Sequence, residues 1–406
     1  MEKKIPYDHK KIGKRIKLFF FYKNLNTGLP IWLPYGIYIY NKIKNFIKKI
    51  NIINKYNEVV TPNIGNYSLY KLSGHLDKYL KNIFKIEYKK KIFLNPMNCP
   101  YHCLIYKFYN NISYKELPIK FYEFGTVFRN EKSGELNGLF RTKVFTQDDG
   151  HIFCKDIKEI VKEIDNIINI ILLIYKKFNL KNYYIRLSLR DKNYIKNEYI
   201  GEKKNWIKSE KVLINIIKKR KINYNISYGD AAFYGPKIDF IIKDSFNRSW
   251  QLSTIQIDYN TPKRFDLKYV DSKNRLLCPV MIHRAFLGSI ERFIGILIEH
   301  YKGFLPVWLL KIQIVIIPIY INHYKYCKLI FNYLIKKKVR CIIDNSSNNL
   351  NKKIKKFEKI NIPIMLIIGE KEKVENRIFL RIKNKKNKNL KIKDAFKYIL
   401  EYINNN

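Results

Sequence analysis

The segment at residues 124–153 limits the possible folds more than any other part of the chain. Its sequence is FGTVFRNEKSGELNGLFRTKVFTQDDGHIF, in which two runs of alternating apolar residues enclose a polar loop with Gly134 and Gly138. Alternation with a period of two is typical of a strand with one buried face. The segment therefore predicts a strand, a long loop and a second strand.

The second of these strands carries an unusual number of polar side chains. Within five residues of a run that is otherwise suited to burial stand Gln147, Asp148, Asp149 and His151. Polar groups crowded onto a half-buried strand usually face a ligand pocket, because burial without a partner is costly. At the end of the first strand, Arg129 and Glu131 stand two residues apart and face the same side. They belong either to such a site or to a structural ion pair.

Helices and strands do not alternate regularly in the first three quarters of the chain. Isoleucine and valine recur at three- and four-residue spacing over 156–177, which predicts a helix, and 290–300 is a second candidate. Strand-like runs surround these helices at 120–129, 144–153, 237–242 and 250–259. This irregular order favours an α+β domain on an antiparallel sheet.

From about residue 311 the pattern becomes a regular alternation. Short buried strands are expected at 312–317, 339–343, 364–368 and 378–382, and helices at 324–338, 350–359 and 391–403. Strands that alternate with helices predict a small α/β domain. Because glycine and proline interrupt the pattern at 303–311, we place one domain at 1–308 and the next at 309–406.

Composition excludes several classes of protein. The 406 residues are 47% hydrophobic, which is enough for packed cores, yet apolar stretches such as 167–175 are far shorter than the roughly 18 residues of a membrane helix. The lysine-rich start and six scattered cysteines favour neither a signal peptide nor a disulfide framework. We therefore expect a cytoplasmic protein with no membrane partner.

The net charge of +45, from 79 basic and 34 acidic residues, has two explanations. Basic side chains give proteins affinity for nucleic acid phosphates, but a chain rich in Lys, Asn, Ile, Tyr and Phe also reflects AT-rich codons. The scarce arginines are more informative, because the planar guanidinium binds phosphate or carboxylate through two parallel hydrogen bonds and lysine does not. Four of them fall inside the motifs: Arg129, Arg141, Arg284 and Arg292.

Two further segments concentrate reactive side chains. FLNPMNCPYH (93–102) contains Cys99 and His102, and VMIHRAFLGSIERF (280–293) leads through His283 into a helix. A cysteine and two histidines from separate segments are a suitable set for zinc with an open coordination position. A buried cysteine and hydrogen-bonded histidines of structural role are the alternative.

Six blocks of the sequence, taken together and in order, resemble the class II aminoacyl-tRNA synthetases, and among them the threonyl-tRNA synthetases. They lie at 61–79, 95–102, 129–153, 232–240, 250–265 and 279–309, and include TPNIGNYSLYKLSGHLDKY, NPMNCPYH and AFYGPKIDF. Six ordered blocks are a much stronger signal than any one of them. The resemblance implies an α+β class II catalytic domain on an antiparallel sheet, followed by a small α/β anticodon-binding domain.

For the nucleotide, the resemblance implies a site for ATP with Mg²⁺ on that sheet. Arg129 is expected to hold the α-phosphate, Glu131 to accept from the adenine amino group and Phe145 to stack on the ring. Arg292 is expected to cover the other face of adenine and to reach the γ-phosphate. The expected ATP site is completed by Gln251, Thr254 and Ser289, and the expected catalytic residues are Arg129, Lys237 and Arg292.

For the amino acid, the resemblance implies one zinc ion per protomer, held by Cys99, His151 and His283. Its open positions are expected to take the amino and hydroxyl groups of threonine and so to exclude valine, which has nearly the same shape. Further threonine contacts are expected from Gln147, Asp149, Tyr234 and Gln256. Departures from the family pattern fall beside these residues and not on them: Tyr101, Gly150, Asp230 and Ala231.

The resemblance also implies a reaction and partners. We expect a threonine–tRNA ligase that acts on threonine, ATP and tRNA(Thr), as a homodimer with the segment of Pro62 near the interface. Relatives usually carry N-terminal domains, one of which hydrolyses mischarged seryl-tRNA. Because the catalytic pattern starts close to Met1, we expect this chain to lack its own editing domain. The alternatives are a prolyl or seryl synthetase and a synthetase-like paralogue that binds RNA without catalysis.

Overall fold

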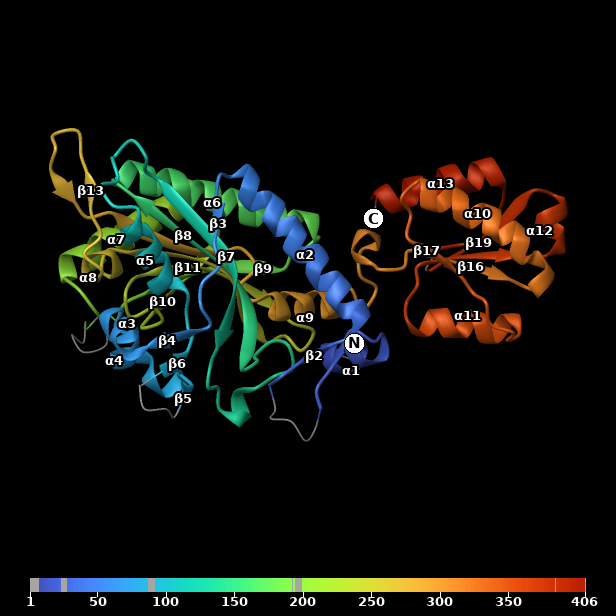
Figure 1. Ribbon diagram of the computed structural model, residues 1–406, viewed down its shortest axis with the longest axis horizontal. Coiled ribbons are helices and arrows are strands. Elements are labelled where there is room, and N and C mark those ends of the chain that lie inside the picture. Colours follow the sequence, from blue (N-terminus) through green and yellow to red (C-terminus); the bar gives the residue numbers. More distant parts are fainter. Residues whose placement is uncertain are drawn as a thin grey trace. The chain divides into compact units, whose positions relative to one another are not determined.

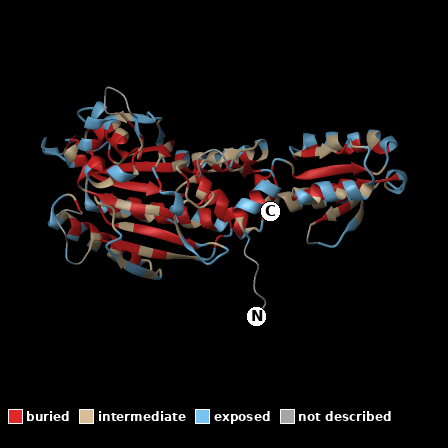
Figure 2. Ribbon diagram, turned by 90° about the horizontal axis from the view of Figure 1, so that it is seen from below, coloured by how far each residue is buried: buried red, intermediate tan, exposed pale blue. Residues whose placement is uncertain are grey.

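The computed structural model describes residues 7–22, 28–86, 92–191, 193, 199–383 and 385–405. Contacts within the chain separate two compact units, one made mainly of residues 44–296 and the other of Tyr7–Phe20, Ile31–Ile43 and Leu297–Asn406. Each unit is built around a sheet whose strands are largely buried, as Figure 2 shows.

An eight-stranded sheet forms the centre of the first unit, in the order β10-β9-β11-β12-β15-β8-β7-β3 (Figure 1). In chain order the strands are β3 (Asn57–Glu58), β7 (Ile119–Phe128), β8 (Val144–Cys154), β9 (Tyr183–Leu189), β10 (Tyr224–Tyr228), β11 (Lys237–Lys243), β12 (Ser249–Asp258) and β15 (Val280–Ala285). All neighbours from β9 to β7 pair antiparallel, whereas the outermost pairs, β10–β9 and β3–β7, are parallel. The predicted antiparallel sheet is confirmed, with a parallel strand added at each edge.

The segment at 124–153 forms the predicted strand, loop and strand. β7 and β8 pair antiparallel from Ile119↔Phe153 to Phe128↔Val144. The loop between them contains one short 3₁₀ turn, η2 (Ser133–Glu135). β8 of this pair lies next to β15 in the sheet, which brings the start of the sixth sequence block beside the third.

The predicted helix at 156–177 is α6 (Ile157–Lys177), which packs against β8, β12 and β15. Asp156 caps its first turn by accepting a hydrogen bond from the backbone N–H of Glu159 at 2.8 Å. The side chains that α6 buries recur at three- and four-residue spacing, as in Ile160, Ile164, Ile167, Ile171 and Ile174. α7 (Lys203–Lys219) packs against α6 and β9.

Smaller elements surround one end of the large sheet. A three-stranded sheet, β4-β6-β5, joins β4 (Ile64–Asn66), β5 (Lys85–Ile86) and β6 (Ile92–Leu94), and β13 (Tyr269–Val270) pairs with β14 (Leu276–Leu277). The helices here are α3 (Tyr67–Leu72), α4 (His75–Tyr79), η1 (Leu80–Asn82), α5 (Cys99–Phe108) and α8 (Thr261–Arg264). α5 is anchored on the sheet by the Tyr106 ring, whose centre lies 4.5 Å from that of Phe153. This contact fixes the helix that begins with Cys99.

The second unit contains a five-stranded sheet in the order β17-β16-β18-β19-β20. Its strands are β16 (Ile314–Pro318), β17 (Cys341–Ile343), β18 (Ile364–Ile368), β19 (Arg377–Ile382) and β20 (Lys388–Lys391). β16 is parallel to β17 and β18, and β19 is antiparallel to both of its neighbours. The predicted α/β arrangement is confirmed, and β20 adds a strand in a lysine-rich stretch where none was expected.

Helices cover both faces of this smaller sheet (Figure 1). α10 (Tyr324–Lys336) and α13 (Ile392–Asn405) pack on one face around Ile314 and Leu366, and α11 (Leu350–Lys359) packs on the other around Val315 and Ile317. The remaining short elements are α1 (His9–Arg15), β1 (Phe19–Phe20), β2 (Ile31–Trp32), η3 (Val307–Leu309), η4 (Ile321–His323) and α12 (Glu370–Val374). Two further helices, α2 (Pro34–Ile53) and α9 (Ile290–His300), complete the chain. Across the part of the chain that the structure describes, no helix is both long and apolar enough to span a membrane.

Candidate active site

A cavity of about 450 Å³ lies over the large sheet of the first unit. Its floor comes from β8, β12 and β15, and α5 and the start of α9 contribute to its walls. On β8 every second side chain faces the cavity, namely Phe145, Gln147, Asp149 and His151. The polar strand that stood out in the sequence therefore lines the cavity, since alternate residues of a strand point to one face.

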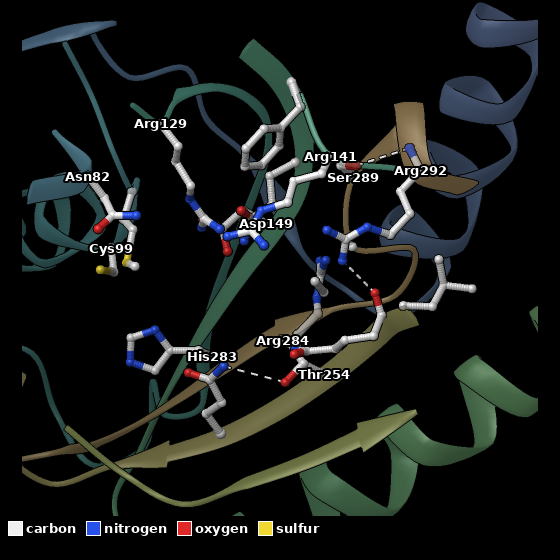
Figure 3. Close-up of a pocket in the computed structure, with 18 of the residues that line it drawn as sticks. Asn82, Cys99, Arg129, Arg141, Asp149, Thr254, His283, Arg284, Ser289 and Arg292 are labelled. Carbon is white, nitrogen blue, oxygen red and sulfur yellow. Dashed lines mark hydrogen bonds between the residues drawn. The ribbon is translucent and has the colours of Figure 1, made fainter. Parts of the chain in front are cut away.

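All but one of the residues that sequence analysis placed in the site line this cavity. They are Cys99, Arg129, Glu131, Phe145, Gln147, Asp149, His151, Tyr234, Gln251, Thr254, Gln256, His283, Ser289 and Arg292. In Figure 3, Cys99 and His283 lie toward one side of the cavity, Ser289 and Arg292 lie toward the opposite side, and Arg129 points in between them. The cavity thus has two chemically different halves.

Lys237 is the exception. On β11 it stands directly opposite Gln256 of β12, so it neighbours the cavity without lining it. Its Nζ lies 3.3 Å from Oδ2 of the fully buried Asp239. Asp239 in turn accepts a hydrogen bond from Oγ1 of Thr254 at 2.8 Å, which connects Lys237 indirectly to a residue of the cavity floor.

One half of the cavity gathers the three residues of the candidate metal site. One possible ligand atom from each of Cys99, His151 and His283 lies within 4.8 Å of the other two, and all three residues are buried. The two histidines form a cross-strand pair of β8 and β15, and Nε2 of His151 lies 3.0 Å from Nδ1 of His283. Cys99 joins them from the first turn of α5.

The chemistry of this set fits a zinc ion. A thiol and two imidazole nitrogens are the donors that zinc prefers, and three protein ligands leave a position open. Burial raises the pKa of the Cys99 thiol well above its usual value, so the site favours a neutral thiol unless a cation is near. A bound divalent cation reverses this preference, because it stabilises the thiolate. Around the set, Oδ2 of Asp258 lies 3.0 Å from Nε2 of His283.

Polar groups suited to a small substrate stand next to the candidate metal site. Asp149 is buried and its Oδ2 accepts a hydrogen bond from Nδ2 of Asn98 at 3.1 Å. The Tyr234 hydroxyl donates to Oε1 of Gln256, and the Tyr234 ring stacks on His283 with the ring centres 4.7 Å apart. A carboxylate, a phenol and an amide thus face the same half of the cavity as the candidate ligands.

The other half of the cavity concentrates guanidinium groups. The Arg292 side chain donates from Nε to the carbonyl of Phe140 at 2.8 Å and from Nη1 to that of Gln251 at 2.6 Å. The pKa of Arg292 is lowered to about 10, mainly by burial and to a smaller extent by repulsion from the charges of Arg129 and Arg141. Guanidinium groups that are held close together despite their mutual repulsion suit an anionic ligand with several negative charges.

Arg129 and Glu131 do not pair with each other among the described ion pairs. Glu131 instead pairs with Arg141: its Oε2 accepts a hydrogen bond from Nε of Arg141 at 2.9 Å and lies 2.7 Å from Nη2 of the same guanidinium. The Arg129 guanidinium lies over the Phe145 ring, 5.0 Å from its centre. Its Nε is buried and has no hydrogen-bond partner within the described structure, while the side chain as a whole lines the cavity.

Sequence profiles of two protein families match the chain. The tRNA synthetase class II core domain (G, H, P, S and T) matches residues 82–301, which contain the whole predicted set of site residues. The chain belongs to the class II tRNA synthetases. The profile of the anticodon binding domain matches residues 313–402, in the second unit of this synthetase.

Curated relatives agree with this assignment. A threonine–tRNA ligase of Azobacteroides pseudotrichonymphae genomovar. CFP2 is 45% identical over 391 residues, which cover 95% of this chain and 60% of the relative. A threonine–tRNA ligase of Bacteroides fragilis (strain YCH46) is 44% identical over 385 residues, which cover 94% of this chain and 59% of the relative. The synthetase chain therefore spans about 60% of the length of these relatives.

A solved structure is similar over almost its whole length. It is described as the RNA binding domain of threonyl-tRNA synthetase from Cryptosporidium parvum Iowa II, and it superimposes with a TM-score of 0.88 at 36% sequence identity. The match covers 97% of this chain and 98% of that chain. The predicted resemblance to threonyl-tRNA synthetases and the predicted class II fold are confirmed.

Arg141, in the lining of the synthetase cavity, and His75, beside it, were not predicted as site residues from the sequence. Arg141 was singled out only as one of few arginines, and nothing in the sequence indicated its pairing with Glu131. His75 lies beside the candidate metal site, with Nε2 4.0 Å from the Cys99 sulfur and 3.0 Å from that of Met97. Burial lowers the pKa of His75 to about 3, so it is neutral at physiological pH. A lone histidine in a short helix gives no sequence signal of such a position.

Proposed function

We propose that the protein is a threonine–tRNA ligase, which activates threonine with ATP to threonyl-adenylate and transfers the threonyl group to tRNA(Thr). One observation carries the proposal: a buried Cys–His–His set and a group of arginines line the same cavity, which has a volume of about 450 Å³. The first set would hold a zinc ion whose open positions take an amine and a hydroxyl, and the arginines suit a triphosphate. An enzyme that joins an amino acid to a nucleotide requires both halves together.

In the activation step, a carboxylate oxygen of threonine attacks the α-phosphorus of ATP, and pyrophosphate leaves. We assign Arg129 to the α-phosphate, where negative charge grows in the transition state, and the position of its guanidinium in the cavity lining, over the Phe145 ring, supports this role. Arg292 is assigned to the γ-phosphate and the adenine, with Glu131 and Phe145 as further adenine contacts. The remaining ATP contacts are Gln251, Thr254 and Ser289, and Mg²⁺ accompanies the phosphates.

In the amino-acid half, Cys99, His151 and His283 are proposed to hold one zinc ion per protomer. When bound, zinc supplies open coordination positions for the amino and hydroxyl groups of threonine. Asp149 would accept a hydrogen bond from the N–H of the substrate's amino group, and Gln147, Tyr234 and Gln256 would close around the substrate. Lys237 remains proposed as a catalytic residue, acting from beside Gln256.

Two kinds of function compete with this one: another class II synthetase, prolyl or seryl, and a non-catalytic paralogue. A prolyl synthetase has a substrate without a hydroxyl group, so a thiol–imidazole metal set beside its amino acid would serve no purpose. A seryl synthetase would use a hydroxyl, and here the likeness to threonine–tRNA ligases favours threonine. A non-catalytic RNA-binding paralogue would not need to hold Arg129, Arg141 and Arg292 together against their repulsion.

We propose a homodimer, with the segment around Pro62 near the interface. β3 is an edge strand of the large sheet, and the residues before and after it expose apolar side chains: Ile53 is 78% exposed and Val60 is 92% exposed. Exposed apolar side chains beside an open strand edge are features that a partner subunit would cover. Sedimentation of the purified protein tests this state.

The division of labour along the chain is proposed as catalysis by 1–308 and anticodon binding by 309–406, in the cytoplasm. The family profiles end at 301 and begin again at 313, on either side of the proposed boundary. Part of the large positive charge of the chain would then serve tRNA phosphates.

Pyrophosphate exchange with each of the twenty amino acids tests the proposed function. Exchange that depends on threonine, and at most weakly on serine, is the expected result. Exchange with proline or serine as the preferred substrate would favour the first alternative, and no exchange with any amino acid would favour the second. Aminoacylation of tRNA(Thr) transcript then tests the transfer step.

A further inference from the structure

A chain of hydrogen-bonded side chains extends from His151 away from the cavity. Nδ1 of His151 lies 2.8 Å from Nδ1 of His102, and Nε2 of His102 lies 3.1 Å from Oε1 of Glu123. Glu123 also accepts two hydrogen bonds from Thr61, from its hydroxyl at 2.8 Å and from its backbone N–H at 3.0 Å. His102, His151 and Glu123 are all buried.

Which atoms donate and which accept along this hydrogen-bonded chain follows from Glu123, the carboxylate at the end away from the cavity. A carboxylate that already accepts from Thr61 is an acceptor only, so Nε2 of His102 carries the proton that it donates to Glu123. In neutral His102 the other ring nitrogen, Nδ1, then has a lone pair and accepts. The proton between His102 and His151 therefore belongs to Nδ1 of His151, which leaves the lone pair of His151 on Nε2.

A carboxylate acts on the second histidine in the same sense. Asp258 accepts from Nε2 of His283, so the lone pair of His283 is on Nδ1. The two lone pairs consequently face each other across 3.0 Å, on the side where the Cys99 sulfur lies. Two acceptors at this distance repel unless a cation stands between them.

We propose that Glu123 and His102 are positioning residues, which set the tautomer of His151 and present its Nε2 lone pair to the metal. The inference rests on the proposed zinc site and extends it by one layer of residues. Carboxylate groups commonly orient a metal-ligating histidine directly; here the carboxylate acts through a second imidazole. One helix thus has two roles in the site: α5 supplies the proposed ligand Cys99 and, three residues later, His102, which orients the ligand His151 on β8.

Three substitutions of His102 separate this role from a merely structural one. Asn places a carbonyl oxygen near the position of Nδ1 and keeps an acceptor for His151, but it no longer reaches Glu123. Gln places its amide near the position of Nε2 and keeps the contact with Glu123, but it offers no acceptor to His151. Phe keeps the ring and removes both contacts. A buried histidine with a carboxylate partner elsewhere, His323 with Glu370 at 3.0 Å, supplies the control variant His323→Phe.

The readout is the dissociation constant of zinc, measured by competition with a chelator on the full chain, together with the absorption spectrum of the cobalt-substituted protein. We expect His102→Gln and His102→Phe to weaken zinc binding by about 10- to 100-fold, the usual scale for loss of an orienting partner. The zinc affinity of His102→Asn should stay within about 3-fold of that of the unchanged protein, and so should that of His323→Phe. The cobalt spectrum should shift in the first two variants only.

Equal zinc affinity in the Asn and Gln variants would overturn the inference, and this comparison stands even where the Phe variant is not recovered folded. An unchanged protein that binds no zinc would overturn both the zinc site and the inference that rests on it. Zinc bound tightly by every variant would overturn the inference alone and leave the proposed function intact.

Discussion

His151 and His283 face each other as a cross-strand pair of β8 and β15, with Nε2 of the first 3.0 Å from Nδ1 of the second, although 132 residues separate them in the chain. Their meeting follows from the sheet order, which places β15 directly beside β8. Cys99 reaches the same point from α5, a helix whose Tyr106 ring packs on Phe153 of β8 itself. The candidate metal site is thus a product of topology, and each ligand can be tested separately.

The first prediction concerns the thiol. Cys99→Ser should lose zinc and threonine-dependent pyrophosphate exchange together, since a serine hydroxyl is a poor zinc ligand. The matched control is Cys103→Ala: Cys103 is buried one helical turn later, with its sulfur 3.9 Å from that of Met281, and lies outside the candidate set. Metal analysis of both variants decides the matter. Zinc lost from the Cys103 variant and kept in the Cys99 variant would refute the ligand set.

The local pattern of the sequence predicted individual elements well. β18 and α11 occupy 364–368 and 350–359 as expected, because each is a continuous run of apolar or amphipathic spacing. The pairing partners of those elements could not be derived in the same way. Nothing in the spacing of His151 and His283 indicates that their strands are neighbours, so the metal set came from family resemblance and not from periodicity.

The second prediction concerns Arg129. Arg129→Lys should reduce the rate of adenylate formation by about 10²- to 10³-fold, which is about 2.7–4 kcal/mol of transition-state stabilisation. The ammonium of lysine cannot reproduce the planar fork of a guanidinium, which Arg129 presents in the cavity lining. Single-turnover formation of adenylate measures the effect, and an unchanged melting temperature shows that the fold is intact. Near-normal pyrophosphate exchange in this variant would show that Arg129 does not bind the α-phosphate in the transition state.

The third prediction concerns Trp250, which stands between Arg292 and an exposed turn. Its ring centre lies 5.6 Å from the Arg292 guanidinium and 5.0 Å from the Phe140 ring, and its Nε1 donates to Asp244 at 2.8 Å. Trp250→Ala should raise the KM for ATP by about 2- to 30-fold, the equivalent of a cation–π contact of about 0.5–2 kcal/mol.

Trp250→Phe provides the matched control, because it keeps an aromatic face for Arg292 and loses only the bond to Asp244. We expect its KM for ATP to stay close to that of the unchanged protein, with the KM for threonine constant in both variants. A change in threonine KM as large as that for ATP would indicate a general disturbance of the cavity instead.

Side-chain partners were the least predictable part of the site. Glu131 and Arg129 are two residues apart on one strand end, which suggested a possible ion pair, yet Glu131 binds Arg141 from the far end of the loop. The alternation of a strand predicts the face of the sheet on which a side chain lies, but it does not predict which loop residue will pair with that side chain. Lys237 likewise follows its strand pattern and stands opposite Gln256, but the buried Asp239 holds its ammonium outside the cavity lining.

The fourth prediction concerns stability. Arg284 is buried and donates to Asp148 at 2.8 Å and to Asn51 at 2.5 Å. Arg284→Met should reduce the free energy of unfolding at neutral pH by about 3–5 kcal/mol, because it leaves the Asp148 charge buried without its cation. The double variant Arg284→Met/Asp148→Asn should recover part of this loss, as measured by urea denaturation.

The pH dependence of the Arg284 variant follows from Asp148. Burial already raises the pKa of Asp148, and removal of the Arg284 charge raises it further. A carboxyl whose pKa is higher in the folded than in the unfolded state binds protons preferentially when folded, so stability declines as pH rises through that interval. The deficit of the variant should therefore be smaller in mildly acidic buffer than at neutral pH. A deficit that grows on acidification would mean that Asp148 is not the group responsible.

The last prediction concerns the choice of amino acid. Serine offers the amino and hydroxyl groups that the proposed zinc would take, and lacks one methyl of threonine, a difference worth about 1–3 kcal/mol or 10- to 200-fold in kcat/KM. Valine keeps the shape but has no hydroxyl, so the groups built to bind one are left unpaired, and rejection of about 10⁴- to 10⁵-fold is expected. Pyrophosphate exchange with threonine, serine and valine gives the three constants. In Cys99→Ser the exchange with threonine and with serine should fall together, because both depend on the same metal. Valine activated as readily as serine would mean that shape, and not the hydroxyl, selects the substrate.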